Sequence, residues 1–253
     1  MIKIEKIKLN ENERIDDLEF NNLKIIQNKN YFCFGMDAVL LSDFAKNIRN
    51  DSTVIDLGTG TGIISILLSG KTKITKIYGI EIQKEIFEMA NKSIKLNSLE
   101  NKIELINDNI KNINKYFKNN SIDAIVTNPP YKKENTGIKN ENKNQLISRY
   151  EVEANLEDFI KISAQLLKDK GEFYMVHRPD RIVDIIDILR KNKLEPKIIK
   201  LVYPKINKSP NLILIKAVKN ANQFLKFEEP LIIYDENNNY TKQLLKIYNK
   251  EEK

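Results

Sequence analysis

The chain has 253 residues, with 42 Lys and Arg, 35 Asp and Glu and one His, which gives a formal charge of +7. An apolar fraction of 41% and a charged fraction of 30% exclude a disordered or collagen-like chain. The longest uncharged run, residues 57–70, is shorter than the ~20 residues that a membrane-spanning helix needs. The first residues lack the apolar stretch of a secretory signal, and the single Cys33 allows neither an internal disulfide nor a cysteine-rich metal site. We therefore expect a cytoplasmic protein with no membrane association and no bound metal.

Short apolar runs alternate with amphipathic segments along most of the chain. A hairpin is predicted around residues 20–34 and a helix at 37–47, ahead of a regular strand and helix alternation that is typical of a parallel sheet with helices on both faces. The strands are predicted at 53–57, 76–82, 103–107, 122–127 and 171–177, and the helices at 62–69, 84–97, 156–167 and 181–191.

The two closing strands, 197–203 and 212–218, are joined by a turn too short for a parallel crossover, so they are predicted to be antiparallel. A seven-stranded, mostly parallel α/β sheet with one antiparallel strand resembles the Rossmann-like fold of class I methyltransferases and differs from that of dinucleotide-binding dehydrogenases. No repeat or linker divides the chain. We expect one domain over 1–253, with an N-terminal extension (1–50), a core (51–218) and a tail (219–253).

A glycine-rich sequence, DLGTGTG at residues 56–62, lies where the first core strand meets its helix. Glycines permit a tight turn and a close approach of the backbone to a ligand, and the helix start offers free N–H groups. This is the nucleotide position of a doubly wound sheet, although NAD enzymes have similar loops. The candidate cofactor contacts are Asp56, Gly58, Thr59, Gly60 and Gly62.

Acidic residues follow the next two strands. Glu81, with Ile82 beside it, ends the second core strand, where a carboxylate can accept hydrogen bonds from both ribose hydroxyls of an adenosine. Asp108 can accept from an adenine amino group while the backbone N–H of Asn109 donates to a ring nitrogen. The alternatives are a surface acid at 81 and an Asx turn at 108–109.

The sequence Asn128-Pro129-Pro130-Tyr131 directly follows the fourth core strand. An amine conjugated to a ring is a poor nucleophile, because its lone pair is delocalised. The Asn128 side-chain oxygen and the Pro129 carbonyl can each accept one amine hydrogen and so aim the lone pair at an incoming methyl group, while the prolines restrict the backbone. Tyr131 can stack on a planar substrate. The motif thus predicts catalytic residues for a planar conjugated nitrogen.

With this motif the chain resembles S-adenosylmethionine-dependent N-methyltransferases of the Asn-Pro-Pro-Tyr type, which act on adenine or cytosine amino groups or on a glutamine amide. Further segments resemble the tRNA(Val) adenine-37 N6-methyltransferase family over nearly the whole chain; they are residues 14–45, 149–151, 156–158, 175–179 and 230–234. Tyr150 departs from the family pattern, in which His often follows the arginine.

The resemblance implies S-adenosylmethionine as cofactor, S-adenosylhomocysteine as product, tRNA as partner and no obligate protein partner. It places Gln27, Phe34 and Asp37 at the border of the cofactor pocket, with Asn128 also near the cofactor. The target adenine would be flipped out of its stack into the pocket. The candidate RNA contacts are Lys132, Lys133, Lys139, Lys143, Arg149, His177 and Arg178.

Several alternatives remain open at the level of the sequence. A release-factor glutamine methyltransferase carries the same four-residue motif, but usually also a helical N-terminal domain for which residues 1–50 are too short. A non-catalytic RNA-binding module would leave the motif without a role, and so would an NAD-dependent dehydrogenase. Arg178 could equally form a surface ion pair, and the basic stretch 190–208 could be a solvated face rather than an RNA contact.

Overall fold

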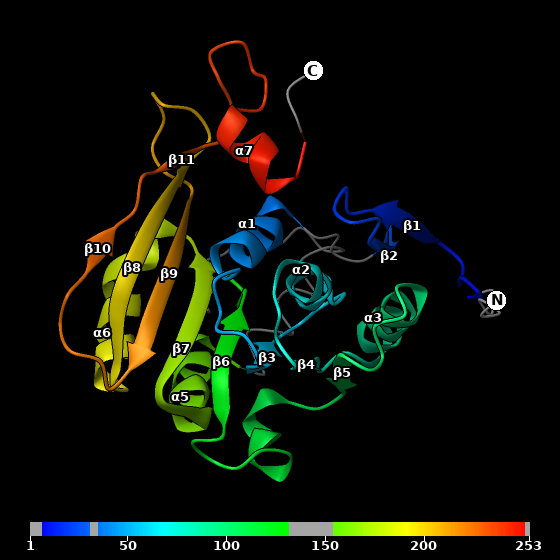
Figure 1. The fold of residues 1–253 in the computed structure, drawn as a ribbon, viewed down its shortest axis with the longest axis horizontal. Helices are drawn as coiled ribbons and strands as arrows, with labels where there is room; N and C mark the ends of the chain where they lie inside the picture. Colours follow the sequence, from blue (N-terminus) through cyan, green and yellow to red (C-terminus); the bar gives the residue numbers. More distant parts are fainter. Residues whose placement is uncertain (1–6, 31–34, 132–153, 251–253) are drawn as a thin grey trace.

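The computed structural model describes residues 7–30, 35–131 and 154–250, and a mixed sheet forms its centre (Figure 1). The strands of this sheet are β3 (Thr53–Leu57), β4 (Lys76–Ile80), β5 (Ile103–Ile106), β6 (Ile122–Thr127), β7 (Leu167–His177), β8 (Leu194–Tyr203), β9 (Leu212–Lys219), β10 (Lys226–Phe227) and β11 (Leu231–Ile232). The helices are α1 (Met36–Phe44), α2 (Ile63–Lys71), α3 (Lys84–Leu96), α5 (Leu156–Leu166), α6 (Ile182–Lys191) and α7 (Lys242–Ile247), with short 3₁₀ turns at η1 (Ile110–Lys115) and η2 (Pro179–Arg181).

The strand order is β10-β8-β9-β7-β6-β3-β4-β5, with β11 also paired to β8. β9 runs antiparallel to both of its neighbours, β7 and β8, and the other paired strands of this sheet are parallel. The predicted seven-stranded sheet with one antiparallel strand is therefore confirmed. Two strands of two residues each are added along the edge strand β8, from the segment that follows β9.

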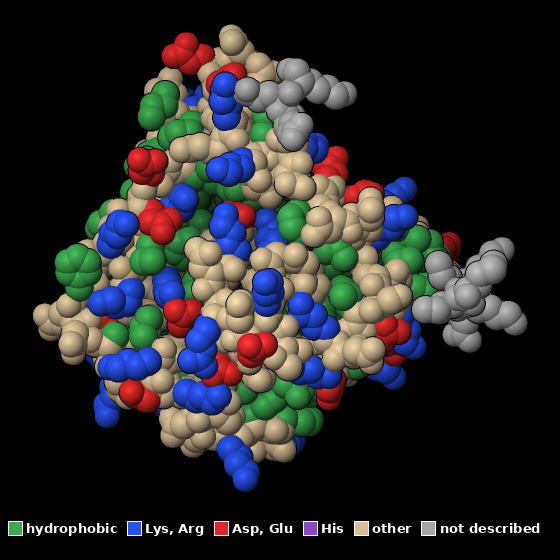
Figure 2. Space-filling view, in the orientation of Figure 1, with side chains coloured by type: hydrophobic (Ala, Val, Ile, Leu, Met, Phe, Trp, Pro, Cys, Tyr) green, Lys and Arg blue, Asp and Glu red, His purple; other side chains and the backbone are tan. Residues whose placement is uncertain are grey.

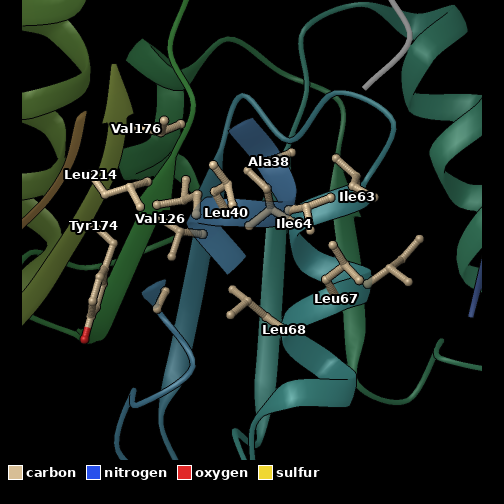
Figure 3. Close-up of a cluster of buried hydrophobic side chains, with 14 of the residues drawn as sticks. Ala38, Leu40, Ile63, Ile64, Leu67, Leu68, Val126, Tyr174, Val176 and Leu214 are labelled. Atoms are coloured by element: carbon tan, nitrogen blue, oxygen red, sulfur yellow. The ribbon is translucent and has the colours of Figure 1, made fainter. Parts of the chain in front are cut away.

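Helices cover both faces of the sheet because its strands carry apolar side chains on both faces. In β3, Val54 belongs to the cluster under α1, α2 and α7, whereas Ile55 and Leu57 belong to the cluster under α5 and α6. Figure 3 shows part of the first cluster, in which Leu40 of α1 and Ile64 of α2 pack near Val126 of β6. None of the helices in the described ranges is both long and apolar enough to cross a membrane.

The N-terminal hairpin lies earlier in the chain than predicted. Its strands are β1 (Glu13–Asp17) and β2 (Lys24–Asn28), so the prediction of 20–34 was wrong for the first strand. The sequence of β1, ERIDD, has no apolar run to reveal it, and its turn uses Asn21 and Asn22 at positive φ. The hairpin packs on α3, where the backbone N–H of Ile26 donates to Ser93 Oγ at 2.9 Å.

Other boundaries move by a few residues. β7 begins at Leu167, directly after α5, and β8 begins at Leu194 rather than 197. Both early starts coincide with register irregularities, beside Ile122 in β6 and at Pro196 in β8. A proline lacks the N–H that a regular β-ladder needs, so Pro196 does not look like part of a strand. A prediction that begins after it therefore starts the strand too late. The helix α7 was not predicted.

Candidate functional site

Parallel pairing brings the carboxyl ends of five strands to one edge of the sheet. Leu57 of β3 pairs with both Ile80 of β4 and Thr127 of β6, and the same register continues outward to β5 and β7. The residues that follow these strands are Gly58, Glu81, Asn107, Asn128 and, at the end of β7, His177. The topology therefore gathers the sequence-predicted motifs at one edge, as ligand sites of open α/β sheets require.

The glycine loop turns sharply between β3 and α2. Gly58, Gly60 and Gly62 have φ values of +71°, +57° and +83°, which other residues rarely adopt. The backbone N–H groups of Gly58 and Thr59 both donate to the Ile80 carbonyl at 3.0 Å, which ties the loop to β4. Nothing lies within 4 Å of a Cβ built at Gly60, so the loop faces open space where a ligand can approach its backbone.

Asp56 supports this loop from within the core. Its side chain is fully buried, and its Oδ2 atom accepts hydrogen bonds from Thr59 Oγ1 at 2.6 Å and Ser65 Oγ at 2.8 Å. Its Oδ1 atom has no hydrogen-bond partner among the described residues. Burial raises the pKa of Asp56 to about 6, and the two hydroxyl bonds oppose that rise. The direct role of this carboxyl group is to shape the loop; its predicted contact with a cofactor stays a prediction.

Glu81 reaches back to the loop from β4. Its Oε2 atom accepts from the Gly60 N–H at 2.9 Å and its Oε1 atom from the Gln83 N–H at 2.8 Å. The segment after β4 is fixed by Asn107, whose Nδ2 donates to the backbone carbonyl oxygens of Glu81 at 2.8 Å and Ile82 at 3.1 Å. The carboxylate predicted to meet a ribose is thus fixed beside the open side of the glycine loop.

Asp108 and Asn109 are largely engaged by their own segment. Asp108 accepts from Asn112 Nδ2 at 2.7 Å and from the Tyr116 hydroxyl at 2.8 Å, and these bonds lower its pKa to about 2. Asn109 caps the η1 turn by accepting from the Lys111 N–H at 2.9 Å. The Asx-type turn considered from the sequence is therefore present, and an adenine contact by Asp108 stays a prediction.

The Asn-Pro-Pro-Tyr motif forms a side-chain network with α1. Asn128 Nδ2 donates to Asp37 Oδ2 at 3.0 Å. The Tyr131 hydroxyl lies 2.8 Å from the same Asp37 oxygen and 2.7 Å from Asn128 Oδ1. Tyr131 was expected to stack on a substrate; in this structure its ring packs on His177, with ring centroids 5.1 Å apart.

His177 is completely buried behind Tyr131. Its Nδ1 lies 3.4 Å from the Arg178 carbonyl, and its Nε2 has no hydrogen-bond partner in the part of the chain that the structure describes. Burial lowers the pKa of His177 to about 4, so the ring is neutral at physiological pH. Arg178 is exposed and lies 3.5 Å from Asp180, which is the surface ion pair considered from the sequence.

The remaining predicted residues divide into two groups. Gln27 is buried in β2 and donates from Nε2 to Asp16 Oδ2 at 2.5 Å, an arrangement that holds the hairpin. The predictions for Phe34, Lys132, Lys133, Lys139, Lys143 and Arg149 fall outside the described residues. No group of three or more metal-ligating side chains occurs within residues 7–30, 35–131 and 154–250. Lys and Arg side chains are spread over the face in Figure 2 with acidic ones between them, so charge alone does not mark an RNA surface there.

Sequence reasoning missed several residues that build this edge. Ser65 holds Asp56, Asn107 holds the loop after β4, and Gly79 leaves room for the glycine loop, since a Cβ there would lie 2.5 Å from Leu105 Cδ2 and 3.0 Å from Thr59. Gln83 has a buried Nε2 atom without a hydrogen-bond partner in the described ranges, at the same edge as Glu81. Asn107 could have been found from the sequence, because it is a polar residue at the carboxyl end of a predicted strand.

Comparison with known proteins identifies the family of the chain. The family described as methyltransferase small domain matches residues 22–191. A tRNA1(Val) (adenine(37)-N6)-methyltransferase of Haemophilus influenzae (strain PittEE) is 25% identical over 229 residues, covering 90% of this chain and 94% of its own. The enzyme of the same description from Histophilus somni (strain 129Pt) is 27% identical over 231 residues, covering 89% and 92%.

Solved structures share the fold at lower identity. The crystal structure of a predicted O-methyltransferase from Agrobacterium tumefaciens superposes with a TM-score of 0.69 at 20% identity, covering 85% of this chain and 96% of its own. M. jannaschii TYW2, solved in complex with AdoMet, gives a TM-score of 0.57 at 16% identity, covering 83% and 87%. These likenesses confirm the class I methyltransferase fold.

Proposed function

We propose that this chain, which belongs to the methyltransferase small domain family, transfers a methyl group to the exocyclic N6 of an adenine in tRNA. Family and fold together make it an S-adenosylmethionine-dependent methyltransferase. We propose in addition that this adenine is residue 37 in the anticodon loop of tRNA(Val). We also propose that the protein acts in the cytoplasm. The observation that carries the proposal is the Asn-Pro-Pro-Tyr motif at the end of β6, beside the glycine loop.

The residues of the β3 and β4 ends fit the cofactor. The space beside Gly60 is open, so a nucleoside can approach the backbone there, and Glu81 lies beside it with both carboxylate oxygens directed at backbone N–H groups of this edge. Hydroxyl groups of a ribose can join or replace these N–H donors. The buried Nε2 of Gln83 offers one further donor at the same edge. S-adenosylmethionine supplies the methyl group to this site.

The residues of the β6 end fit a planar amine. Asn128 Oδ1 and the Pro129 carbonyl each accept one hydrogen of N6, which turns the nitrogen lone pair toward the methyl donor. Pro130 limits the backbone freedom of the turn, so the two acceptors are fixed before the substrate arrives. Tyr131 offers the base a flat aromatic face. Proximity and orientation then carry most of the rate enhancement.

The relatives favour tRNA over other acceptors. Both relatives above, from Haemophilus influenzae and Histophilus somni, are described as tRNA1(Val) (adenine(37)-N6)-methyltransferases, and they match about nine-tenths of this chain. The exposed cation Arg178, near the carboxyl end of the sheet, is suited to a phosphate contact. A glutamine amide shares the planar conjugated nitrogen, so an amide acceptor is the alternative outcome of the test.

The test is nucleoside mass spectrometry after incubation of the purified protein with S-adenosylmethionine and unmodified tRNA. We expect N6-methyladenosine to appear with the wild-type protein and to be lost with Asn128→Ala, while both proteins bind S-adenosylmethionine in calorimetry. Binding of S-adenosylmethionine without any methylated nucleoside would contradict the proposed acceptor and turn the search to a protein glutamine.

A further inference from the structure

We propose that Asp37 is a positioning residue of the acceptor site. Its carboxylate fixes which way round the Asn128 amide lies and draws the Tyr131 hydroxyl away from the Asn128 oxygen. The inference rests on the proposed function, because it concerns how Asn128 is prepared to receive an amine. It assigns Asp37 a different task from the cofactor contact that the sequence resemblance implied.

The first step concerns the orientation of an amide. The oxygen and nitrogen ends of an asparagine side chain are nearly equal in shape, yet only the oxygen end can accept a hydrogen from an amine. An ionised carboxylate accepts hydrogen bonds and cannot donate them, so it selects the nitrogen end of its neighbour. Asp37 Oδ2 lies 3.0 Å from Asn128 Nδ2, which leaves Asn128 Oδ1 on the side of the motif.

The second step concerns the proton of Tyr131. Its hydroxyl has one hydrogen and two acceptors within reach, Asp37 Oδ2 at 2.8 Å and Asn128 Oδ1 at 2.7 Å. A hydrogen bond to a charged acceptor is roughly twice as strong as one to a neutral acceptor, so the proton favours Asp37. Burial, together with the Asp37 charge, raises the pKa of Tyr131 and keeps the phenol protonated. Asn128 Oδ1 therefore retains its lone pairs for an incoming amine.

The third step concerns how Asp37 itself is held. Its other oxygen, Oδ1, accepts from the Ala38 N–H at 2.9 Å, and α1 buries Ala38, Val39, Leu40 and Leu41 against the core. Gly35 lets the carboxylate lie close to the backbone, because a Cβ at that position would approach Asp37 Oδ1 to 2.7 Å. The carboxylate is thus anchored by the helix that carries it.

The arrangement also matches the charge change of the reaction. As the sulfur–carbon bond breaks and the nitrogen–carbon bond forms, the positive charge moves from the sulfonium to N6, and one N6 proton then leaves to solvent. A carboxylate behind the amide makes Asn128 Oδ1 more negative through the N–H bond that it accepts. Asp37 therefore stabilises the developing charge through Asn128, without touching the substrate.

Asp37→Asn keeps the size of the side chain and removes its charge. We expect kcat for tRNA methylation to fall about tenfold or more, with the dissociation constant for S-adenosylmethionine within twofold of wild type. The matched control is Asp43→Asn on the same helix, where Asp43 pairs with Lys46 and Lys71 instead of the motif. That control should lower the melting temperature and leave kcat unchanged.

A second variant distinguishes positioning from a general loss of structure. Gly35→Ala keeps Asp37 and displaces its carboxylate, so it should lower kcat in the same way. In a Tyr131→Phe background no hydroxyl competes for Asn128 Oδ1, so the further loss caused by Asp37→Asn should be smaller than in wild type. Additive losses would contradict the role of Asp37 in drawing the hydroxyl away.

Two results would overturn the proposal. A raised dissociation constant for S-adenosylmethionine with unchanged kcat would make Asp37 a cofactor contact, and unchanged kinetics would leave it without a role. If wild-type protein binds S-adenosylmethionine but methylates no adenine, the proposed function fails separately. The side-chain ¹⁵N amide resonance of Asn128 still tests the positioning then, because Asp37→Asn must shift it if the bond exists.

Discussion

The two halves of the sheet edge are built in different ways. At the β3 and β4 ends, carboxylates close onto neighbouring backbone and hydroxyl groups: Asp56 holds Thr59 and Ser65, and Glu81 holds Gly60 and Gln83. At the β6 and β7 ends, side chains bond to side chains from distant parts of the chain, with Asp37 lying 91 residues before Asn128 and 94 before Tyr131. After the ligands proposed for them, we call these the cofactor half and the acceptor half.

The difference concerns what each half requires of the chain. The cofactor half is assembled within one strand, turn and helix and its neighbouring strand, so local backbone geometry determines it. The acceptor half exists only when α1 is docked on the sheet, because Asp37 belongs to α1. The first half therefore depends on turn chemistry, and the second depends on tertiary packing.

The largest expected effects concern the two buried titratable groups, which respond to pH in opposite directions. Folding raises the pKa of Asp56 from 3.8 to about 6, so its contribution to stability decreases as pH rises through this range. In Asp56→Asn this dependence is absent. The difference in unfolding free energy between variant and wild type should change by about 2 kcal/mol in favour of the variant from pH 4 to pH 7. Urea unfolding of both proteins at pH 4 and pH 7 measures this change. The same free-energy difference between variant and wild type at both pH values would contradict a raised pKa for Asp56.

His177 gives the opposite slope in the acceptor half. Folding lowers its pKa from 6.5 to about 4, so its contribution to stability is present above pH 6.5 and is lost as pH falls toward 4. His177→Leu removes this titration. Relative to wild type, the variant should gain about 3 kcal/mol in unfolding free energy between pH 7 and pH 4. Imidazole resonances in NMR give the pKa directly, and a value near 6.5 would show that His177 is solvated.

A smaller effect is expected for the ribose contact proposed for Glu81. The carboxylate already bonds to two backbone N–H groups, so binding a ribose exchanges partners rather than adding all of its bonds. We expect Glu81→Ala to weaken S-adenosylmethionine binding about tenfold, measured by calorimetry. The control is Glu104→Ala on the adjacent strand β5, where the side chain is exposed beside Lys76. Equal losses in both variants would point to a general destabilisation of the sheet.

The smallest effect is expected at the protein surface. Arg178 is exposed and only loosely paired with Asp180, so it is available for a phosphate. Arg178→Ala should weaken tRNA binding about threefold at 0.1 M salt and reduce the slope of log affinity against log salt by ~0.7 to 0.9. Arg14→Ala on β1, paired with Asp16, is the matched control. Filter binding over a salt series distinguishes the two.

The sequence predicted the cofactor half more completely than the acceptor half, for the same physical reason. The strand and glycine turn at 53–62 are specified by residues next to one another, and the confirmed sheet order follows from repeated alternation of apolar runs. The bond from Asp37 to Asn128 has no local pattern, because it joins two elements that only the folded core brings together. The polar strand β1 and the short helix α7 escaped prediction because neither carries a strong periodic signal.

The docking of α7 has a consequence for the order in which each new molecule is completed. Leu244 of α7 is fully buried against the cluster that includes α1, and Lys71 Nζ of α2 donates to the Ile247 carbonyl at 3.2 Å. Chains grow from the N-terminus, so α1 leaves the ribosome long before the residues that complete its packing. The glycine turn can form while synthesis continues, whereas the helix that carries Asp37 gains this support only after residues 242–247 of α7 emerge. The acceptor half is therefore the last part of the site to mature in every newly made chain.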